Sequence, residues 1–355
     1  MKLTRRQFLS ATGAAAIAAA GEVALRGQTS AVVEPASPVI DFHVHLFGVG
    51  DGGTGCYLSE KQRRHFTYPF FVRLMRLREN GRMDEDYVQR LVAMLRTSSV
   101  QKAVLLAQDS RYNSAGLPDR EKTPFFVPND YLFQVVARFP DLFIPCVSIN
   151  PKRRDAIEEL DRCTELGARV LKIHPPIQDV DPAENRFRPF YRRCAERKVI
   201  VMAHTGTEHA AEIVGNEFSD PQRLVPALEE GCTVIASHSG AGSIIDKEDF
   251  FPNLLPLVRR FPKFYCDTAA LALTFRWRSL PRLLQEPEIL ERTIHASDVP
   301  FPSDPLVFWN RLPYGTLFQL ATEENLFERD YRLKLALGVP AAVFERSARL
   351  LKDMA

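Results

Sequence analysis

Short apolar runs alternate along the chain with longer stretches of helical periodicity. The apolar runs cover residues 39–44, 102–106, 143–149, 169–173, 199–203, 233–237, 263–267 and 293–297, and amphipathic stretches among them cover 83–96, 129–139, 154–166, 188–197, 221–230 and 251–261. Eight strands that alternate with helices form an α/β fold, the (β/α)8 TIM barrel. We therefore predict this barrel over residues 39–355, with two closing helices within 323–354.

The connection after the first strand, residues 46–82, is too long for a bare loop in a compact domain. It begins with several glycines and continues with basic and aromatic residues from Arg63 to Arg82. We interpret it as an insertion that covers the barrel mouth. The density of aromatic residues argues against the alternative, a disordered insert.

Residues 1–30 have the character of a targeting signal. The segment Thr4-Arg5-Arg6-Gln7-Phe8-Leu9-Ser10 and the Ala-rich run after it resemble a twin-arginine export signal. The run is too short to span about 30 Å of hydrocarbon, so we expect no transmembrane span in the mature chain. The resemblance implies that the twin-arginine export machinery carries the folded protein to the periplasm or the extracellular space. Residues 31–38 are predicted to be a linker.

Charge and composition exclude several classes of partner. The chain has 46 Lys and Arg against 44 Asp and Glu, a net charge of +2. The first 30 residues carry +3 of it, which leaves about −1 for the remainder, without the basic excess of a nucleic-acid binder. We expect a small-molecule substrate and no nucleic-acid partner, and the sequence leaves the formation of a homo-oligomer open. The six cysteines have no paired short spacing and are expected to be buried free thiols, with a disulfide as the alternative.

Five of the eight histidines lie at or just after the carboxyl ends of predicted strands: His43, His45, His174, His204 and His238. That end of a TIM barrel carries the active site. In the first strand, alternation predicts that Asp41, His43 and His45 share the inward face. Two buried histidines on one face need a partner, and a divalent metal is the simplest one.

Alternation predicts the inward residues of two later strands as well. It places Ile294, Ala296 and Asp298 on one face of the eighth strand. In the sixth strand it places Val234, Ala236 and His238 on one face.

Five segments in order resemble a known enzyme family. They are Asp41-Phe42-His43-Val44-His45, Lys172-Ile173-His174-Pro175-Pro176, His204-Thr205-Gly206, His238-Ser239-Gly240 and Ser297-Asp298-Val299-Pro300. Together they resemble the amidohydrolase superfamily, in particular amidohydrolase family 2, the branch that includes aminocarboxymuconate-semialdehyde decarboxylase.

The resemblance implies one divalent metal ion, with zinc expected. Its ligands would be His43, His45, His204 and Asp298. His238 would orient or deprotonate the metal-bound water or stabilise a developing oxyanion, and Asp298 would also serve as a proton acceptor.

Two residues of the fourth strand are predicted to lie on the substrate side. Lys172 points into the barrel, and in other branches of the superfamily such a lysine is carboxylated and bridges two metals. We interpret Lys172 as a charged or hydrogen-bonded support residue of a mononuclear site, with the binuclear site as the alternative. His174 either faces the substrate or is a rigid turn residue before Pro175 and Pro176.

Three functions fit these residues. The preferred one is a metal-dependent hydrolase whose metal-activated water attacks a C–O or C–N acyl-type bond. The alternative is a lyase, a decarboxylase or hydratase that acts on a small carboxylic acid and would need an arginine aimed at the substrate carboxylate; Arg169, Arg276, Arg278 and Arg282 are the candidates. A binding module without catalysis is the third, and the presence of both Asp298 and His238 argues against it.

Overall fold

The computed structural model describes residues 37–354. The predicted leader, residues 1–30, lies outside the described residues, as does most of the predicted linker. Within 37–354, no helix combines the length and the apolar character needed to cross a membrane.

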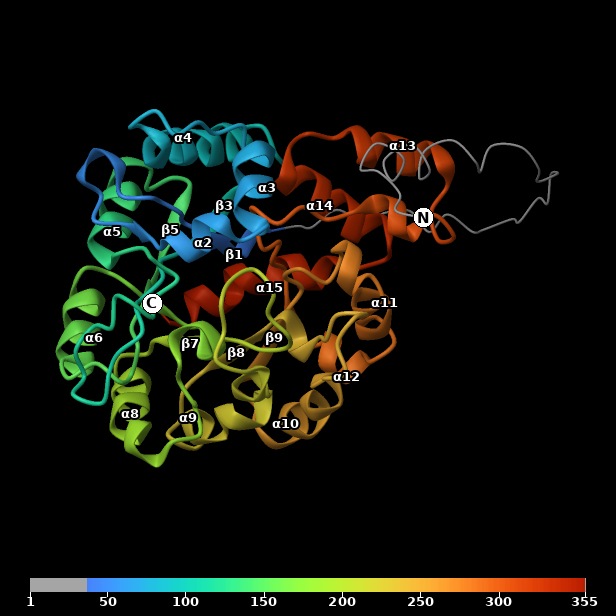
Figure 1. Cartoon of the computed structure of the whole chain (residues 1–355). Helices are drawn as coiled ribbons and strands as arrows, with labels where there is room; N and C mark the ends of the chain where they lie inside the picture. Colours follow the sequence, from blue (N-terminus) through green and yellow to red (C-terminus); the bar gives the residue numbers. More distant parts are fainter. Residues whose placement is uncertain (1–36, 355) are drawn as a thin grey trace, which may run out of the picture. The chain divides into compact units, whose positions relative to one another are not determined.

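Eight parallel strands within residues 37–354 follow one another around a barrel in chain order, with helices outside the ring (Figure 1). The predicted barrel is therefore confirmed. The eighth strand is shorter than predicted because its regular pairing ends at Ile294. The strands are β1 (Ile40–His45), β3 (Lys102–Leu106), β5 (Phe143–Ser148), β6 (Val170–Ile173), β7 (Ile200–His204), β8 (Val234–Ser237), β9 (Phe264–Asp267) and β10 (Thr293–Ile294).

The barrel is nearly closed between its first and last strands. The amide of Phe42 donates to the carbonyl of His295 at 3.1 Å, and a parallel bridge joins Val44 to Val299. The amide of Asp298 donates to the carbonyl of His43 at 3.0 Å. These bonds bring the end of β1 beside the segment that follows β10.

The helices follow from amphipathic patterns such as that of α4, which buries Tyr87, Val88 and Leu91 and has three acidic residues in its first turn. All six predicted helices form, although two of them begin as a 3₁₀ turn. Those six are α4 (Met83–Arg96), α5 (Asn129–Arg138), α6 (Ala156–Glu165), α8 (Arg188–Glu196), α9 (Val225–Glu229) and α10 (Leu254–Arg260). The others that border the barrel are α7 (Pro175–Gln178), α11 (Ser279–Leu283), α12 (Pro287–Leu290), α13 (Tyr314–Thr322), α14 (Leu326–Ala336) and α15 (Ala341–Lys352).

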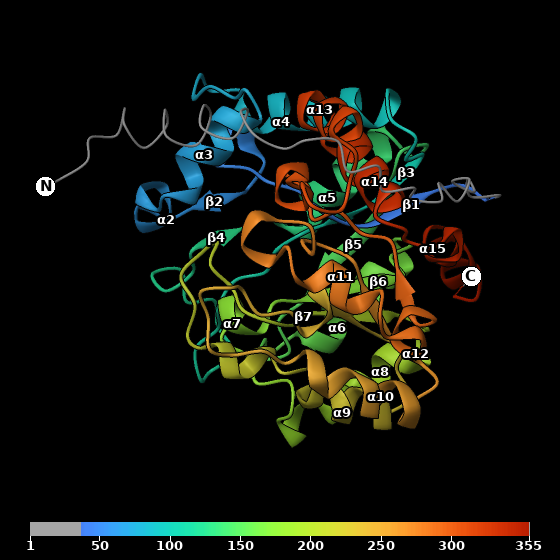
Figure 2. The same ribbon diagram turned by 90° about the vertical axis from the view of Figure 1, so that its right-hand side faces the viewer.

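The two predicted closing helices are α14 and α15. Leu350 of α15 packs against the apolar side chains inside the barrel, and α15 lies at the end of the barrel opposite α2 and α7 (Figure 2). Helix α13 precedes them and was not predicted.

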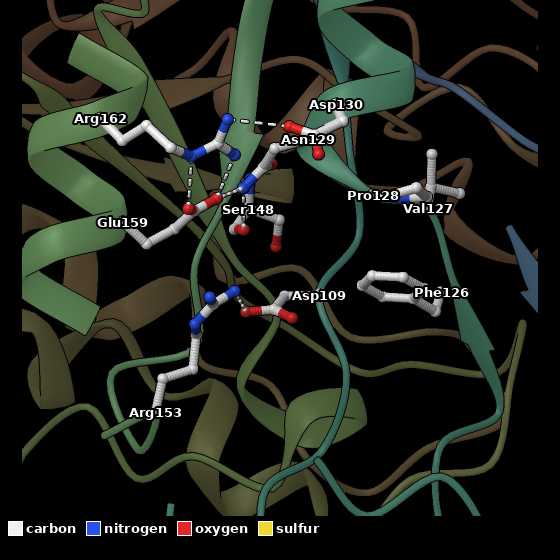
Figure 3. Close-up of a pocket in the computed structure, with 10 residues that line it drawn as sticks. All are labelled: Asp109, Phe126, Val127, Pro128, Asn129, Asp130, Ser148, Arg153, Glu159 and Arg162. Carbon is white, nitrogen blue, oxygen red and sulfur yellow. Dashed lines mark hydrogen bonds and ion pairs between the residues drawn. The ribbon is translucent and has the colours of Figure 1, made fainter. Parts of the chain in front are cut away.

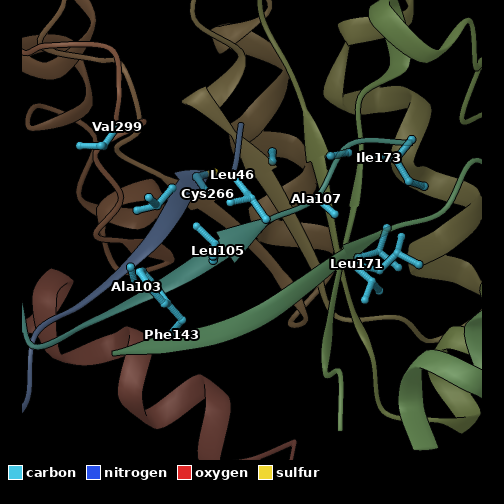
Figure 4. Close-up of a cluster of buried hydrophobic side chains, with 14 of the residues drawn as sticks. Leu46, Ala103, Leu105, Ala107, Phe143, Leu171, Ile173, Cys266 and Val299 are labelled. Atoms are coloured by element: carbon cyan, nitrogen blue, oxygen red, sulfur yellow. The ribbon is translucent and has the colours of Figure 1, made fainter. Parts of the chain in front are cut away.

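Two layers of apolar side chains form the core. One fills the barrel interior with residues such as Val104, Val170 and Ile235. The other lies between strands and helices and contains Leu105 and Leu171 (Figure 4). All six cysteines are buried and free, as expected; they are Cys56, Cys146, Cys163, Cys194, Cys232 and Cys266.

The prediction for the inward face of the first strand is wrong for one residue. The pairing of β1 with β3 shifts register between Asp41 and Val44, so that Phe42 packs inside the barrel. The Oδ1 atom of Asp41 accepts hydrogen bonds from the amides of His43 at 3.1 Å and Ser297 at 2.9 Å. Asp41 therefore joins β1 to the last strand segment and does not accompany the histidines.

The alternation predicted for the sixth strand is also wrong. Ile235 of β8 belongs to the interior layer, whereas Val234 and Ala236 belong to the outer one. His238 reaches the barrel mouth because its backbone turns into the left-handed region, with φ 62°. The prediction for the eighth strand is confirmed for Ile294 and Ala296, which are both interior.

The insertion after β1 is folded. It contains α2 (Glu60–Arg64), α3 (Thr67–Leu74) and β2 (Tyr57–Leu58), which pairs with β4 (Phe125–Phe126). The insertion also contacts the loop after β7, where the carbonyl of Ala210 accepts hydrogen bonds from Gln62 at 2.8 Å and Thr67 at 2.9 Å. The insertion thus connects the ends of β1 and β7, as expected of a cover over the mouth.

We expect Gly206, directly after β7, to be indispensable for the fold. It has φ +87°, and a Cβ there would collide with the carbonyl oxygen of Ala241. Gly231 is a matched control, because it has φ +88° but its Cβ would have no neighbour closer than 3.9 Å. Gly231→Ala should cost about 1–2 kcal/mol of unfolding free energy from backbone strain alone. Gly206→Ala should cost about 1–3 kcal/mol more than that, because the new methyl group is overpacked. Urea unfolding of both variants measures the two losses, and equal losses of unfolding free energy would contradict the prediction.

Candidate metal centre

The five strand-end histidines come together at the carboxyl ends of the strands. Their rings form a continuous series with centroid separations of 5.0 Å from His45 to His43, 4.9 Å from His43 to His238, 4.6 Å from His238 to His204 and 4.2 Å from His204 to His174. Four of the five are almost fully buried, and the His45 side chain is 20% exposed. The barrel therefore assembles residues that lie more than 190 positions apart in the sequence, from His43 to His238.

Three of the four predicted metal ligands meet directly. The Oδ1 atom of Asp298 lies 3.3 Å from Nε2 of His43 and 3.1 Å from Nε2 of His45. One donor atom from each of the three lies within 4.8 Å of the others. His204 does not join this trio at that distance and lies instead within 4.8 Å of His174 and Glu208.

The remaining predicted ligand carries an unused nitrogen. Nε2 of His204 is buried and has no hydrogen-bond partner among the described residues. Its other nitrogen, Nδ1, lies 3.6 Å from a carboxylate oxygen of Glu208. A buried polar atom without a partner is costly, so Nε2 of His204 is available for a ligand.

In two of the histidines, an oxygen atom lies within hydrogen-bond distance of the Nδ1 atom. Nδ1 of His43 lies 3.2 Å from Asp267, and Nδ1 of His238 lies 3.1 Å from the carbonyl of Ala269. Metal-binding histidines typically engage their second nitrogen in this way. The Nε2 atoms of His43, His204 and His238 are therefore the ones left for chemistry at the mouth.

Burial and nearby positive charge favour the neutral form of the His43 and His238 rings. Burial, with the positive charge of Lys172, lowers the pKa of His43 well below its usual range. Burial, Arg276 and Lys172 do the same to the pKa of His238. A neutral imidazole can bind a cation or accept a proton, so the donor set suits a divalent metal.

Backbone strain accompanies the site. Asp298 has φ 75°, His238 has φ 62° and Ser239 has φ 50°, all in the left-handed region. Such conformations are unfavourable for residues with a Cβ and cluster at functional sites. Two of the predicted site residues, Asp298 and His238, are thus held in strained conformations.

The side chain of Lys172 points into the barrel, as the alternation along β6 predicted. Its Nζ atom lies 3.3 Å from Nε2 of His43 and donates to the hydroxyl of Ser237 at 2.9 Å. Burial lowers the pKa of Lys172 to about 8, although Asp267 and Asp298 oppose this shift. The amine therefore stands directly beside the predicted metal ligands.

His174 has a partner that the sequence did not reveal. Its Nε2 atom lies 3.1 Å from Glu208, and its Nδ1 atom is buried without a hydrogen-bond partner among the described residues. Burial raises the pKa of Glu208, but the hydrogen bond from His174 and the two nearby imidazoles outweigh it and hold that pKa well below its usual range. The available signal was an acidic residue four positions after the β7 histidine.

One of the four candidate arginines is buried and contacts the loop after β7. The guanidinium of Arg276 donates to the carbonyl of Thr207, and its positive charge lowers the pKa of His238. Arg169 bonds to backbone carbonyls before β6, Arg278 stacks on Trp277, and Arg282 pairs with Asp249.

A cavity of about 410 Å³ lies apart from the histidines (Figure 3). Its charged side chains pair with one another: Arg162 with Glu159 and Asp130, and Arg153 with Asp109. This paired network joins α5 to α6 and includes none of the predicted site residues.

Comparisons with solved structures identify the fold. An uncharacterised TIM-barrel protein from Bordetella bronchiseptica is 16% identical, with a TM-score of 0.57 over 89% of this chain and 99% of that one. A putative 2-pyrone-4,6-dicarboxylic acid hydrolase from Pseudomonas putida is 18% identical, with a TM-score of 0.51 over 89% and 97%. A 2,6-dihydroxybenzoate decarboxylase from Rhizobium is 14% identical, with a TM-score of 0.46 over 85% and 98%.

Comparison with curated proteins gave no match. The model of one protein family, described as amidohydrolase, matches residues 40–309. This range contains every strand of the barrel and all the predicted site residues. The chain therefore belongs to the amidohydrolase family, a family of enzymes whose members bind a metal.

Proposed function

We propose that this protein is a metal-dependent hydrolase that cleaves a C–O or C–N acyl-type bond of a small molecule. The observation that supports it best is the buried, unpartnered Nε2 atom of His204 at the barrel end where Asp298 meets His43 and His45. Three imidazoles and one carboxylate suit a divalent cation. These four residues would hold one such ion, and zinc is the metal we expect.

The protein's own residues would handle the protons. When bound, the cation supplies a Lewis acid for the acyl oxygen and lowers the pKa of a coordinated water. His238 would accept a proton at Nε2, because the carbonyl of Ala269 engages its Nδ1. Asp298 would serve both as a ligand and as a proton acceptor.

Lys172 and His174 would form the substrate side of the site. The buried Nδ1 atom of His174 is an acceptor without a partner in the described residues, so a substrate N–H or O–H could bond to it. Lys172, beside His43, would contribute its charge to a developing negative oxygen.

Arg276 supports a second candidate function, a decarboxylase or hydratase of the same fold. A decarboxylase needs a cation that binds the substrate carboxylate, and Arg276 is a buried guanidinium whose charge acts on His238. The same residue would equally orient an anionic ester or lactone in a hydrolase. The two functions therefore differ in the bond broken rather than in the residues present.

Metal analysis combined with a substrate screen tests the proposal. Folded protein should contain one equivalent of divalent metal and should hydrolyse members of a panel of esters, lactones and amides. Chelation should remove the activity, and re-addition of zinc should restore it. Release of carbon dioxide from aromatic carboxylic acids would favour the lyase, and a metal-loaded protein inert toward the whole panel would contradict the proposed hydrolase.

We also propose export by the twin-arginine route, on the basis of Arg5 and Arg6 together with Phe8, Leu9 and the Ala-rich run that follows them. Replacing both by lysine should leave the precursor in the cytoplasm, because this route reads the arginine pair. Fractionation of cells expressing the wild-type chain or the double variant would measure it. Normal export of the lysine pair would contradict this proposal.

A further inference from the structure

Glu208 lies where two histidines and the insertion meet. It sits on the loop after β7, and its side chain is only 10% exposed. One carboxylate oxygen, Oε2, faces both Nε2 of His174 at 3.1 Å and Nδ1 of His204 at 3.6 Å. The other oxygen, Oε1, accepts a hydrogen bond from the amide of Ala210. A single carboxylate therefore pairs with one ring of a stacked pair and lies close to the other.

The position of this carboxylate is set from outside the barrel. Ala210 accepts hydrogen bonds through its carbonyl from Gln62 and Thr67 of the insertion. The amide of Glu208 itself donates to the side chain of Asn216 at 3.1 Å. The loop is thus fixed on both sides of Glu208, which restricts where its side chain can point.

The carboxylate of Glu208 affects which ring nitrogen of His204 carries the proton. A carboxylate at Nδ1 favours the tautomer that carries its proton there and leaves Nε2 free of hydrogen. Nε2 of His204 is the atom that is buried without a partner. Asp267 has the same relation to His43, since it lies 3.2 Å from Nδ1 and leaves Nε2 toward Asp298.

We propose that Glu208 is the positioning residue that orients His204 for cation binding and fixes His174 beside it. The role in cation binding rests on the proposed function, whereas the contacts of Glu208 with the two rings are independent of it. Through Ala210, the insertion would then help to align a ligand of the metal centre.

Glu208→Gln is the decisive variant, because it keeps the size of the side chain and an oxygen for the amide of Ala210 but removes the charge. Glu217→Gln is the matched control, since Glu217 is an exposed residue of the same loop. Zinc affinity of metal-free protein, measured by competition with a chromophoric chelator, should fall about 10–100-fold in Glu208→Gln, the usual cost of losing an outer partner of a ligand. It should be unchanged in Glu217→Gln, and both variants should keep the thermal midpoint near that of the wild type.

A second readout needs no metal. In metal-free protein, the ¹⁵N signals of the His174 and His204 rings should report one fixed tautomer each in the wild type and in Glu217→Gln, and a mixture in Glu208→Gln. Unchanged ring signals and wild-type zinc affinity in Glu208→Gln would overturn the inference. Two zinc equivalents in the wild type that fall to one in Glu208→Gln would make Glu208 a ligand of a second ion and would also overturn it. A wild-type chain that takes up no zinc contradicts the proposed function, while the ring signals still decide the role of Glu208 on their own.

Discussion

Replacing His43 and His45 together by alanine should abolish stoichiometric metal binding and, with it, all turnover above background. Both Nε2 atoms lie within 3.3 Å of Asp298, so the double variant removes two of the three donor atoms that meet there. A site reduced to His204 and Asp298 has too few ligands to retain a zinc ion. Elemental analysis of the purified protein, with circular dichroism to verify folding, measures the outcome.

The matched control for that experiment is the double variant His65→Ala and His209→Ala. His65 contacts Thr67 and His209 pairs with Asp246, so neither belongs to the trio formed by His43, His45 and Asp298. This control should retain one equivalent of metal. One equivalent in the His43 and His45 variant would refute the ligand assignment, whereas two equivalents in the wild type would favour the binuclear alternative with carboxylated Lys172.

Removing the side chain of His238 should leave the metal in place but lower turnover about 10²–10⁴-fold, the range for loss of a positioned acid or base. His238 engages the carbonyl of Ala269 through Nδ1 and is not part of the trio formed by His43, His45 and Asp298. Asp298→Asn, by contrast, should weaken both metal binding and turnover. Metal content, thermal midpoint and turnover should be measured on the same samples.

Backbone strain makes the choice of replacement important. His238 has φ 62°, where asparagine is better tolerated than alanine. His238→Asn and His238→Ala should therefore lose similar activity but differ in stability. If His238→Asn turned over substrate at nearly the wild-type rate, His238 would have only a packing role.

The order of the barrel strands could be read from the sequence because it depends on local periodicity. Runs such as 169–173 and 199–203 became β6 and β7 to within a residue, since buried parallel strands are short and continuously apolar. The stretch 83–96 became α4 without change, because its buried positions recur at helical spacing. Helix α13 was missed, as it exposes Tyr314 and Phe318 and so lacks a clear amphipathic pattern.

The site could be predicted only in part, because the directions in which its side chains point depend on departures from regular strand structure. Strict alternation placed Asp41 with the histidines, and a register shift in β1 removed it. The inward position of His238 arises from a left-handed residue after β8, which no period of two can predict.

The sequence by itself determined which strand ends bring their histidines together, because a barrel brings all carboxyl ends of its strands to one face. Only the tertiary structure decided the partners of each ring. Asp267, beside His43, comes from β9, and the charge that Arg276 exerts on His238 comes from the segment after β9. Glu208 is close to His204 in the sequence, but only the fold of the loop after β7 brings its carboxylate to the two rings. Such pairings depend on loop conformation and on distances in space, which spacing along a chain does not encode.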